Sequence, residues 1–143
     1  MLCGCVKKTD TSNLSPTSLI SNSESMHTNY EYGDISDQIV YWDEIPLIDL
    51  NEFIVYFFSR TCGHCQNIKQ QVIPIILSRS NIFACEASNE FAFCNIQPIG
   101  KLDEIDFCII GYPTAVYFKN GSVILYANGG KEVLALLNQN ISL

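Results

Sequence analysis

Two cysteines separated by two residues are the feature of this sequence with the clearest chemistry. The segment FFSRTCGHC places Cys62 and Cys65 directly after a run of apolar and aromatic residues, and the next segment, QNIKQQVI, has helical spacing. A cysteine at a helix start faces unpaired backbone N–H groups and the positive end of the helix dipole, which both favour a thiolate. The spacing therefore predicts a redox-active dithiol.

The helix also assigns a role to each residue of this motif. A cysteine at the first helical position exposes its sulfur, whereas a cysteine three residues later lies one turn deeper on the same face. We therefore expect Cys62 to be the attacking nucleophile and Cys65 to be the resolving thiol that releases a mixed disulfide. His64, when protonated, would stabilise the thiolate further and make the disulfide more oxidising.

A metal site and two buried core cysteines are the alternatives to a dithiol. A structural zinc site normally needs four ligands, usually two C-x-x-C pairs or one pair with two histidines. The sequence has no second C-x-x-C, and its other histidine, His27, lies in a polar N-terminal segment. A core gives no reason for the pair Gly63-His64 between the thiols. We expect neither a metal nor an organic cofactor.

Hydrophobic patterns predict the elements that must position the dithiol. Residues 51–58, NEFIVYFF, are apolar on both faces, as in a central strand that is covered on both sides. The other expected elements are a strand at 38–42, a helix or turn at 43–50, a helix at 65–80 that Pro74 kinks or restarts, a strand at 82–85, a helix at 101–107, a hairpin at 114–128 and an amphipathic helix at 130–141. This order predicts a mixed α/β sheet with helices on both faces.

Two motifs in this order resemble the thioredoxin superfamily. TCGHC follows an apolar strand, IIGYPTAVYFKNG comes about 50 residues later, and the CGHC dithiol is most similar to that of the catalytic domains of protein disulfide isomerase. The similarity extends from residue 40 to residue 141. It implies a thioredoxin-like α/β fold with a mixed sheet of four to five strands and helices on both faces.

The resemblance also implies the residues of the site. Cys62 corresponds to the family's nucleophile, Cys65 to its resolving cysteine, and Pro113 to the cis-proline opposite the dithiol. A cis bond would present the backbone of Tyr112 as a short strand edge to which an extended substrate can pair. We therefore expect Tyr112, Pro113 and Gly63 to bind the substrate.

Three positions depart from the family pattern. Thr61 stands where relatives usually have a tryptophan, and Tyr56 stands where they have a buried acid that takes the proton of the resolving thiol. A phenol, with a pKa of about 10, is a poor base at neutral pH. Resolution by Cys65 is therefore expected to be slow, or to use water or another group. The helix proline that follows the dithiol in relatives is also missing, since Pro74 comes later.

The N-terminal residues 1–37 predict a disordered tether that precedes one domain at residues 38–143. The tether is rich in Ser, Thr and Asn and has no hydrophobic period, so it cannot bury enough surface to offset its ordering entropy. Near its start, LCGC resembles a bacterial lipobox, in which the cysteine, here Cys5, carries a lipid. A signal peptide needs a charged start and an apolar stretch before that cysteine, whereas four residues precede it. A disordered cytoplasmic tail is therefore the alternative.

Three further cysteines, Cys85, Cys94 and Cys108, are expected to be small core residues, because free cysteine is among the most buried residue types. At most one further disulfide can form among them, and sequence distance favours Cys85–Cys94. Cys108 lies just before Pro113 and is therefore placed to approach the active site.

Composition limits the partners of the protein. Its net charge is −7 and no segment is dominated by Lys and Arg, which argues against nucleic acid and against electrostatic binding to anionic lipid. No apolar run approaches the roughly 20 residues that a spanning helix needs. We expect contact with a membrane only through an N-terminal lipid.

Together these features predict a thiol–disulfide oxidoreductase that acts on cysteine-containing proteins or peptides, with oxidase or isomerase work favoured over strong reduction. A redox partner must reset the dithiol. The expected location is outside the cytoplasm, at the cell surface of a bacterium, and the cytoplasm is the alternative. Two other functions stay open: a non-catalytic module that binds a peptide at the Tyr112-Pro113 edge, and an accessory protein of a secretion or peptide-export system.

Overall fold

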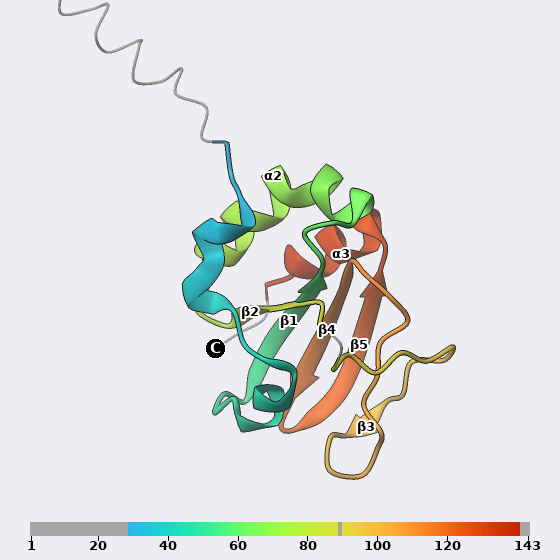
Figure 1. Ribbon diagram of the computed structural model, residues 1–143. Helices are drawn as coiled ribbons and strands as arrows, with labels where there is room; N and C mark the ends of the chain where they lie inside the picture. The colour runs from blue at the N-terminus through green and yellow to red at the C-terminus, as the bar shows by residue number, and fades with distance from the viewer. Residues whose placement is uncertain (1–28, 89, 141–143) are drawn as a thin grey trace, which may run out of the picture.

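A five-stranded mixed sheet forms the centre of the protein (Figure 1). The computed structural model describes residues 29–88 and 90–140. The strands are β1 (Glu52–Phe58), β2 (Ile82–Glu86), β3 (Gly100–Lys101), β4 (Thr114–Lys119) and β5 (Ser122–Asn128), in the spatial order β2-β1-β4-β5-β3. Because β1 is parallel to β2 and antiparallel to β4, the sheet is mixed, as the sequence predicted.

The central strand β1 has no face exposed to water. Residues 53–58 are all buried; the side chains of 54, 56 and 58 enter one core cluster, and those of 53, 55 and 57 enter a second cluster on the other face. Such a strand needs an uninterrupted apolar run instead of an alternating one. The continuous run FIVYFF meets this requirement.

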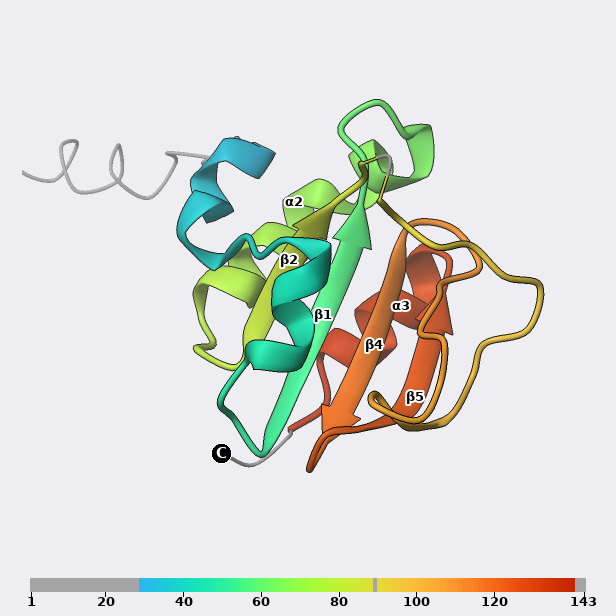
Figure 2. The ribbon, with the colours of Figure 1, turned by 60° about the horizontal axis from the view of Figure 1, so that its bottom comes forward.

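Helices cover both faces of the sheet, as predicted, but unequally. One face is covered by α2 (Gly63–Leu77), α3 (Gly130–Leu137) and the 3₁₀ helix η3 (Tyr32–Gln38). The other face is covered by the 3₁₀ helix η4 (Trp42–Leu47) and by the largely irregular residues 90–112, and Figure 2 shows η4 lying in front of β1. The dithiol thus lies on the α-helical side. None of the helices in the described ranges has the length and hydropathy of a membrane-spanning segment.

The helix α2 continues past Pro74 to Leu77, so the helix does not restart at the proline. Its buried residues are Cys65, Ile68, Val72, Ile73 and Ile76. This apolar side packs against the sheet, so Cys65 lies in the core.

Two predicted elements are wrong. Residues 38–42 form no strand; Ile39 makes an isolated bridge to Ala84, and 3₁₀ helices lie on both sides of it. Residues 101–107 form turns instead of a helix. They are tied to the hairpin, since Lys101 pairs with Ser122 and the N–H of Leu102 donates to the carbonyl of Gly121 at 3.0 Å.

The folded part of the chain begins before the expected boundary at residue 38. In η3, Tyr32 is 2% exposed and Ile35 is 0% exposed, and both belong to the core cluster on the α2 side. Polar residues surround Tyr32 and Ile35, so the sequence shows no hydrophobic period that would place these two side chains in the core. Residues 1–28, which hold Cys5 and most of the expected tether, lie outside the described residues.

The C-terminal hairpin and helix confirm the sequence pattern. Asn120 (φ 50°) and Gly121 (φ 74°) connect β4 to β5 in the left-handed conformation that the Asn-Gly pair predicts. The helix α3 is amphipathic as expected, with Val133, Leu136 and Leu137 buried, but it ends at Leu137 instead of residue 141.

Candidate active site

The dithiol lies at the junction of β1 and α2, because Cys62 is the N-cap of that helix. The backbone N–H of Cys65 donates to Cys62 Sγ at 3.4 Å. Cys62 is half-buried, so it combines contact with the helix end and access from solvent. The sequence predicted Cys62 at the first helical position, and the structure places it one residue earlier, as the N-cap before Gly63.

Cys65 lies on the same helix and is fully buried. Burial raises the pKa of the Cys65 thiol to about 12, although hydrogen bonds from the Ser59 backbone and from Tyr56 oppose this rise. At neutral pH Cys65 is therefore a thiol. The two cysteines differ as the predicted roles require: Cys62 is open to a partner, and Cys65 is protected.

The connection between β1 and α2 is fixed by short hydrogen bonds. The N–H of Cys62 donates to the Ser59 carbonyl at 3.2 Å, and Gln66 Nε2 donates to the Arg60 carbonyl at 2.7 Å. Arg60 itself forms an ion pair with Glu86 at 2.7 Å, at the end of the adjacent strand β2. These contacts hold the dithiol at the end of the sheet.

The Tyr112–Pro113 peptide lies beside the dithiol. This peptide bond is cis, as the resemblance implied, and the Tyr112 carbonyl oxygen is 3.7 Å from Cys62 Sγ, within the range of a weak S–H···O hydrogen bond. Pro113 is buried and its carbonyl accepts from the N–H of Gly129 at 3.0 Å. The pairing of a substrate with this edge stays a prediction.

Gly63 and His64 form the exposed first turn of α2. A Cβ atom added at Gly63 would meet no atom within 4 Å, so the space next to Cys62 is open. The contribution of His64 to thiolate stability stays a prediction.

Of the remaining described cysteines, Cys94 and Cys108 differ from the expectation, whereas Cys85 is a buried core residue as expected. Cys94 and Cys108 form a disulfide with a Cα–Cα distance of 5.8 Å, whereas Cys85 is a buried free thiol. The preference for Cys85–Cys94 was wrong, and so was the prediction that Cys94 and Cys108 are free core residues. The backbone explains the pairing, because Phe93 forms an isolated β-bridge with Ile109 and this brings the two neighbouring cysteines together.

The disulfide-linked segment contacts Tyr112, beside the dithiol, through an aromatic ring. The ring of Phe93 lies 6.1 Å from the ring of Tyr112, centroid to centroid, and Phe93 is 56% exposed.

Within the described ranges, no three His, Cys, Asp or Glu side chains gather in a way that could hold a metal ion.

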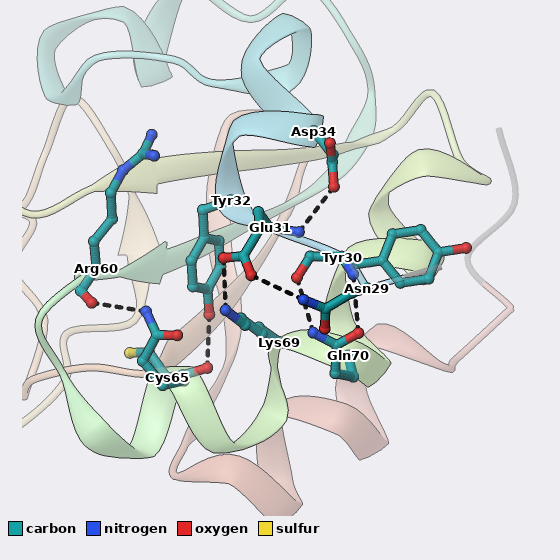
Figure 3. A network of polar contacts seen from close by, with 10 residues as sticks. Asn29, Tyr30, Glu31, Tyr32, Asp34, Arg60, Cys65, Lys69 and Gln70 are labelled. Carbon is teal, nitrogen blue, oxygen red and sulfur yellow. Dashed lines mark hydrogen bonds and ion pairs between the residues drawn. The ribbon is translucent and has the colours of Figure 1, made fainter. Parts of the chain in front are cut away.

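Two tyrosines next to Cys65 were not predicted to act together. The hydroxyl groups of Tyr32 and Tyr56 are 2.8 Å apart. The Tyr32 hydroxyl also donates to the Cys65 carbonyl at 2.8 Å (Figure 3). Burial raises the pKa of both phenols above the usual range. Tyr56 was marked in the sequence by its distance from Cys62, whereas nothing in the polar segment around Tyr32 pointed to the site.

Comparisons with known proteins concern the fold alone. Protein-family models and curated protein sequences give no match. Among solved structures, the chain is similar to a thioredoxin of Plasmodium falciparum (19% identity, 70% of this chain and 95% of that chain, TM-score 0.47) and to oxidised mitochondrial thioredoxin 3 of Saccharomyces cerevisiae (16% identity, 73% and 92%, TM-score 0.47). It is also similar to thioredoxin f2 of Chlamydomonas reinhardtii (18% identity, 71% and 93%, TM-score 0.44). Similarity at this level says nothing about activity.

Proposed function

We propose that this protein is a thiol–disulfide oxidoreductase that exchanges disulfides with protein or peptide thiols through Cys62 and Cys65. The observation that supports the proposal is the asymmetry of the pair on one helix. Cys62 is a half-buried N-cap residue beside open space, and Cys65 is a fully buried thiol that donates its N–H to the first sulfur. Nucleophilic thiolates are found in such partly exposed positions at helix starts.

The exchange takes place in two steps. In the reducing direction, the Cys62 thiolate attacks a substrate disulfide, a mixed disulfide forms, and the first substrate thiolate leaves and takes a proton from water. Cys65 then loses its proton to water, attacks Cys62 Sγ and releases the second substrate thiolate. The substrate gains two electrons, and the Cys62–Cys65 pair loses them. The oxidising direction is the reverse, and a redox partner resets the pair in either case.

The direction of exchange depends on the stability of the Cys62 thiolate. The helix N-terminus and a protonated His64 would stabilise this thiolate, which makes the disulfide more oxidising. We therefore favour oxidase or isomerase work. An extended substrate segment is proposed to lie along Tyr112, whose carbonyl is beside Cys62.

Reduction of the insulin disulfides tests the function against a non-catalytic binding module. Cys62→Ser should abolish the activity of the wild-type protein. Cys85→Ala is the matched control, because it removes a thiol that is buried in the other core cluster, and it should keep the activity. Equal rates for the wild type and Cys62→Ser would instead favour the binding module.

A location outside the cytoplasm is also proposed. The Cys94–Cys108 disulfide supports it, because structural disulfides persist mainly in oxidising compartments. Membrane attachment through Cys5 rests on the sequence motif alone. Fractionation of cells that express the wild type or Cys5→Ser tests it: a lipid anchor predicts that only the wild type enters the membrane fraction.

A further inference from the structure

The segment that precedes η3 is fixed to α2 one turn beyond the dithiol. Lys69 Nζ lies 2.6 Å from a Glu31 carboxylate oxygen. The backbone N–H of Tyr30 donates to Gln70 Oε1 at 3.0 Å, and Gln70 Nε2 donates to the Tyr30 carbonyl at 2.8 Å (Figure 3). These contacts determine where the next residue, Tyr32 in η3, enters the core.

The Tyr32 ring stacks on Phe58 at a centroid distance of 4.2 Å and lies 6.3 Å from the ring of Tyr56. A phenol has one proton to donate. Because the Tyr32 hydroxyl donates its proton to the Cys65 carbonyl, the hydrogen bond between the two hydroxyls uses the proton of Tyr56. In the reduced protein, Tyr56 therefore donates to Tyr32.

Tyr56 and Cys65 belong to the same core cluster, and the Tyr32 hydroxyl joins them, since it contacts both the Tyr56 hydroxyl and the Cys65 carbonyl. Burial raises the pKa of the Cys65 thiol, and hydrogen bonding from Tyr56 is among the smaller effects that lower it. Among the described residues, the buried polar side chains are Ser59, Asn81 and Thr114, so no carboxylate is buried near Cys65. The titratable groups near the thiol are Cys62, Tyr56 and Tyr32, and the hydroxyl of Tyr32 donates to the Cys65 backbone carbonyl. Tyr56 is thus the side-chain donor available to a thiolate at Cys65.

We propose that Tyr56 donates a hydrogen bond to the Cys65 thiolate while the mixed disulfide is resolved, and that Tyr32 is a positioning residue that holds the Tyr56 hydroxyl in place. This inference rests on the proposed function of the dithiol. It assigns to Tyr56 the role of a hydrogen-bond donor, in place of the carboxylate base that the resemblance implies at this position.

The step balances in protons and electrons. The Cys65 thiol loses its proton to water, and the Tyr56 O–H turns from the Tyr32 oxygen toward the new thiolate. The thiolate attacks Cys62 Sγ, the bond between Cys62 and the substrate sulfur breaks, and the substrate thiolate takes a proton from water. Tyr56 keeps its own proton throughout, because burial holds the pKa of this phenol above the usual range.

The size of the effect follows from thiolate chemistry. Loss of one hydrogen bond to a charged group would raise the pKa of the thiol by about one unit, which lowers the thiolate population about tenfold. The more basic sulfur is also a better nucleophile, and with a Brønsted coefficient of about 0.4–0.5 the rate constant of the thiolate rises roughly threefold, which offsets part of the tenfold loss. The net expectation for Tyr56→Phe is a resolution step that is about three- to fourfold slower.

A stopped-flow experiment with an aromatic disulfide that releases a coloured thiolate separates the two steps. The full chain is used with Cys3→Ser and Cys5→Ser, so that N-terminal thiols do not react. The first phase reports attack by Cys62 and depends on the reagent concentration. The second phase reports attack by Cys65 on the mixed disulfide and does not.

The proposal predicts that Tyr56→Phe slows the second phase about three- to fourfold between about pH 6 and 9 and leaves the first phase unchanged. Tyr32→Phe should slow the second phase about twofold, and should have no further effect when Tyr56 is already Phe, because it acts through that hydroxyl. A general structural effect would instead disturb both phases, whereas the proposed role concerns the second phase alone. Tyr30→Phe is the matched control on the same segment and should change neither phase.

An unchanged second phase in Tyr56→Phe, or independent effects of Tyr32→Phe and Tyr56→Phe, would overturn the proposal and leave the proposed function intact. Absence of the first phase in the wild type would instead overturn the proposed function, and this inference with it. If Tyr56→Phe does not fold, Tyr32→Phe decides: an unchanged second phase in that variant refutes the role of the pair.

Discussion

Substitution of Ile35 by alanine is expected to destabilise the protein, because η3 is part of the core. Ile35 is 0% exposed and belongs to the same core cluster as Cys65. Ile→Ala changes at buried positions cost about 2–5 kcal/mol. We expect about 2–3 kcal/mol here, since a short helix at the edge of the cluster can relax partly into the cavity.

Urea unfolding followed by circular dichroism measures this free energy. Ile96→Ala is the matched control, because it removes the same atoms from a side chain in a residue that is 83% exposed, and it should change stability by no more than about 0.5 kcal/mol. If Ile35→Ala and Ile96→Ala have the same effect, η3 is not packed on the domain in solution. The placement of Tyr32 against Cys65 would then also be wrong.

Three other outcomes are expected. Cys94→Ser with Cys108→Ser should lower stability by about 3 kcal/mol, the value for a loop of this length, and a reductant should lower the melting temperature of the wild type but not of the double variant. Hydrogen bonds from Lys119 and Tyr117 lower the pKa of Glu52, so the stability from these contacts is present above the unfolded pKa of about 4.3 and is lost as pH falls through the lower folded pKa. Glu52→Gln should therefore lose less stability than the wild type in thermal melts at low pH. Equal loss of stability in the two proteins would contradict this. Cys65→Ser should trap a mixed disulfide between Cys62 and a client, whose mass identifies it; a complete absence of adducts in cells would argue against a protein substrate and against an accessory role in export.

The elements around the dithiol could be predicted because local and tertiary preferences agree there. The apolar run of β1, the apolar side of α2 and the Asn120-Gly121 turn each require the structure that they adopt. A helix start immediately after a buried strand also fixes the position of Cys62. Cys62 and Cys65 therefore lie at the helix start, as the sequence indicated, whereas the roles of the site residues stay predictions and Cys5 lies outside the described residues.

The segments that were not predicted depend on contacts between distant residues. Residues 90–112 are held by the Cys94–Cys108 disulfide and by pairing with the hairpin, and neither has a local signal. Tyr32 lies in a polar segment, and its importance comes from hydrogen bonds to Tyr56 and Cys65, which are 24 and 33 residues away in the chain. The same explanation holds for Tyr56. The sequence marks this residue only as a replacement for the buried acid of relatives, and its hydrogen bond to Tyr32 is visible only in the fold.

A redox titration of Cys62 and Cys65 tests the central claim most directly. The protein is equilibrated with glutathione buffers, quenched by alkylation and analysed by mass spectrometry. We predict a reversible two-electron transition between a Cys62–Cys65 disulfide and the dithiol, faster alkylation of Cys62 than of Cys65 in the reduced state, and a midpoint above about −270 mV, the value for thioredoxin. A lower midpoint would reject the oxidising direction, and absence of a Cys62–Cys65 disulfide at every potential would contradict the redox function itself.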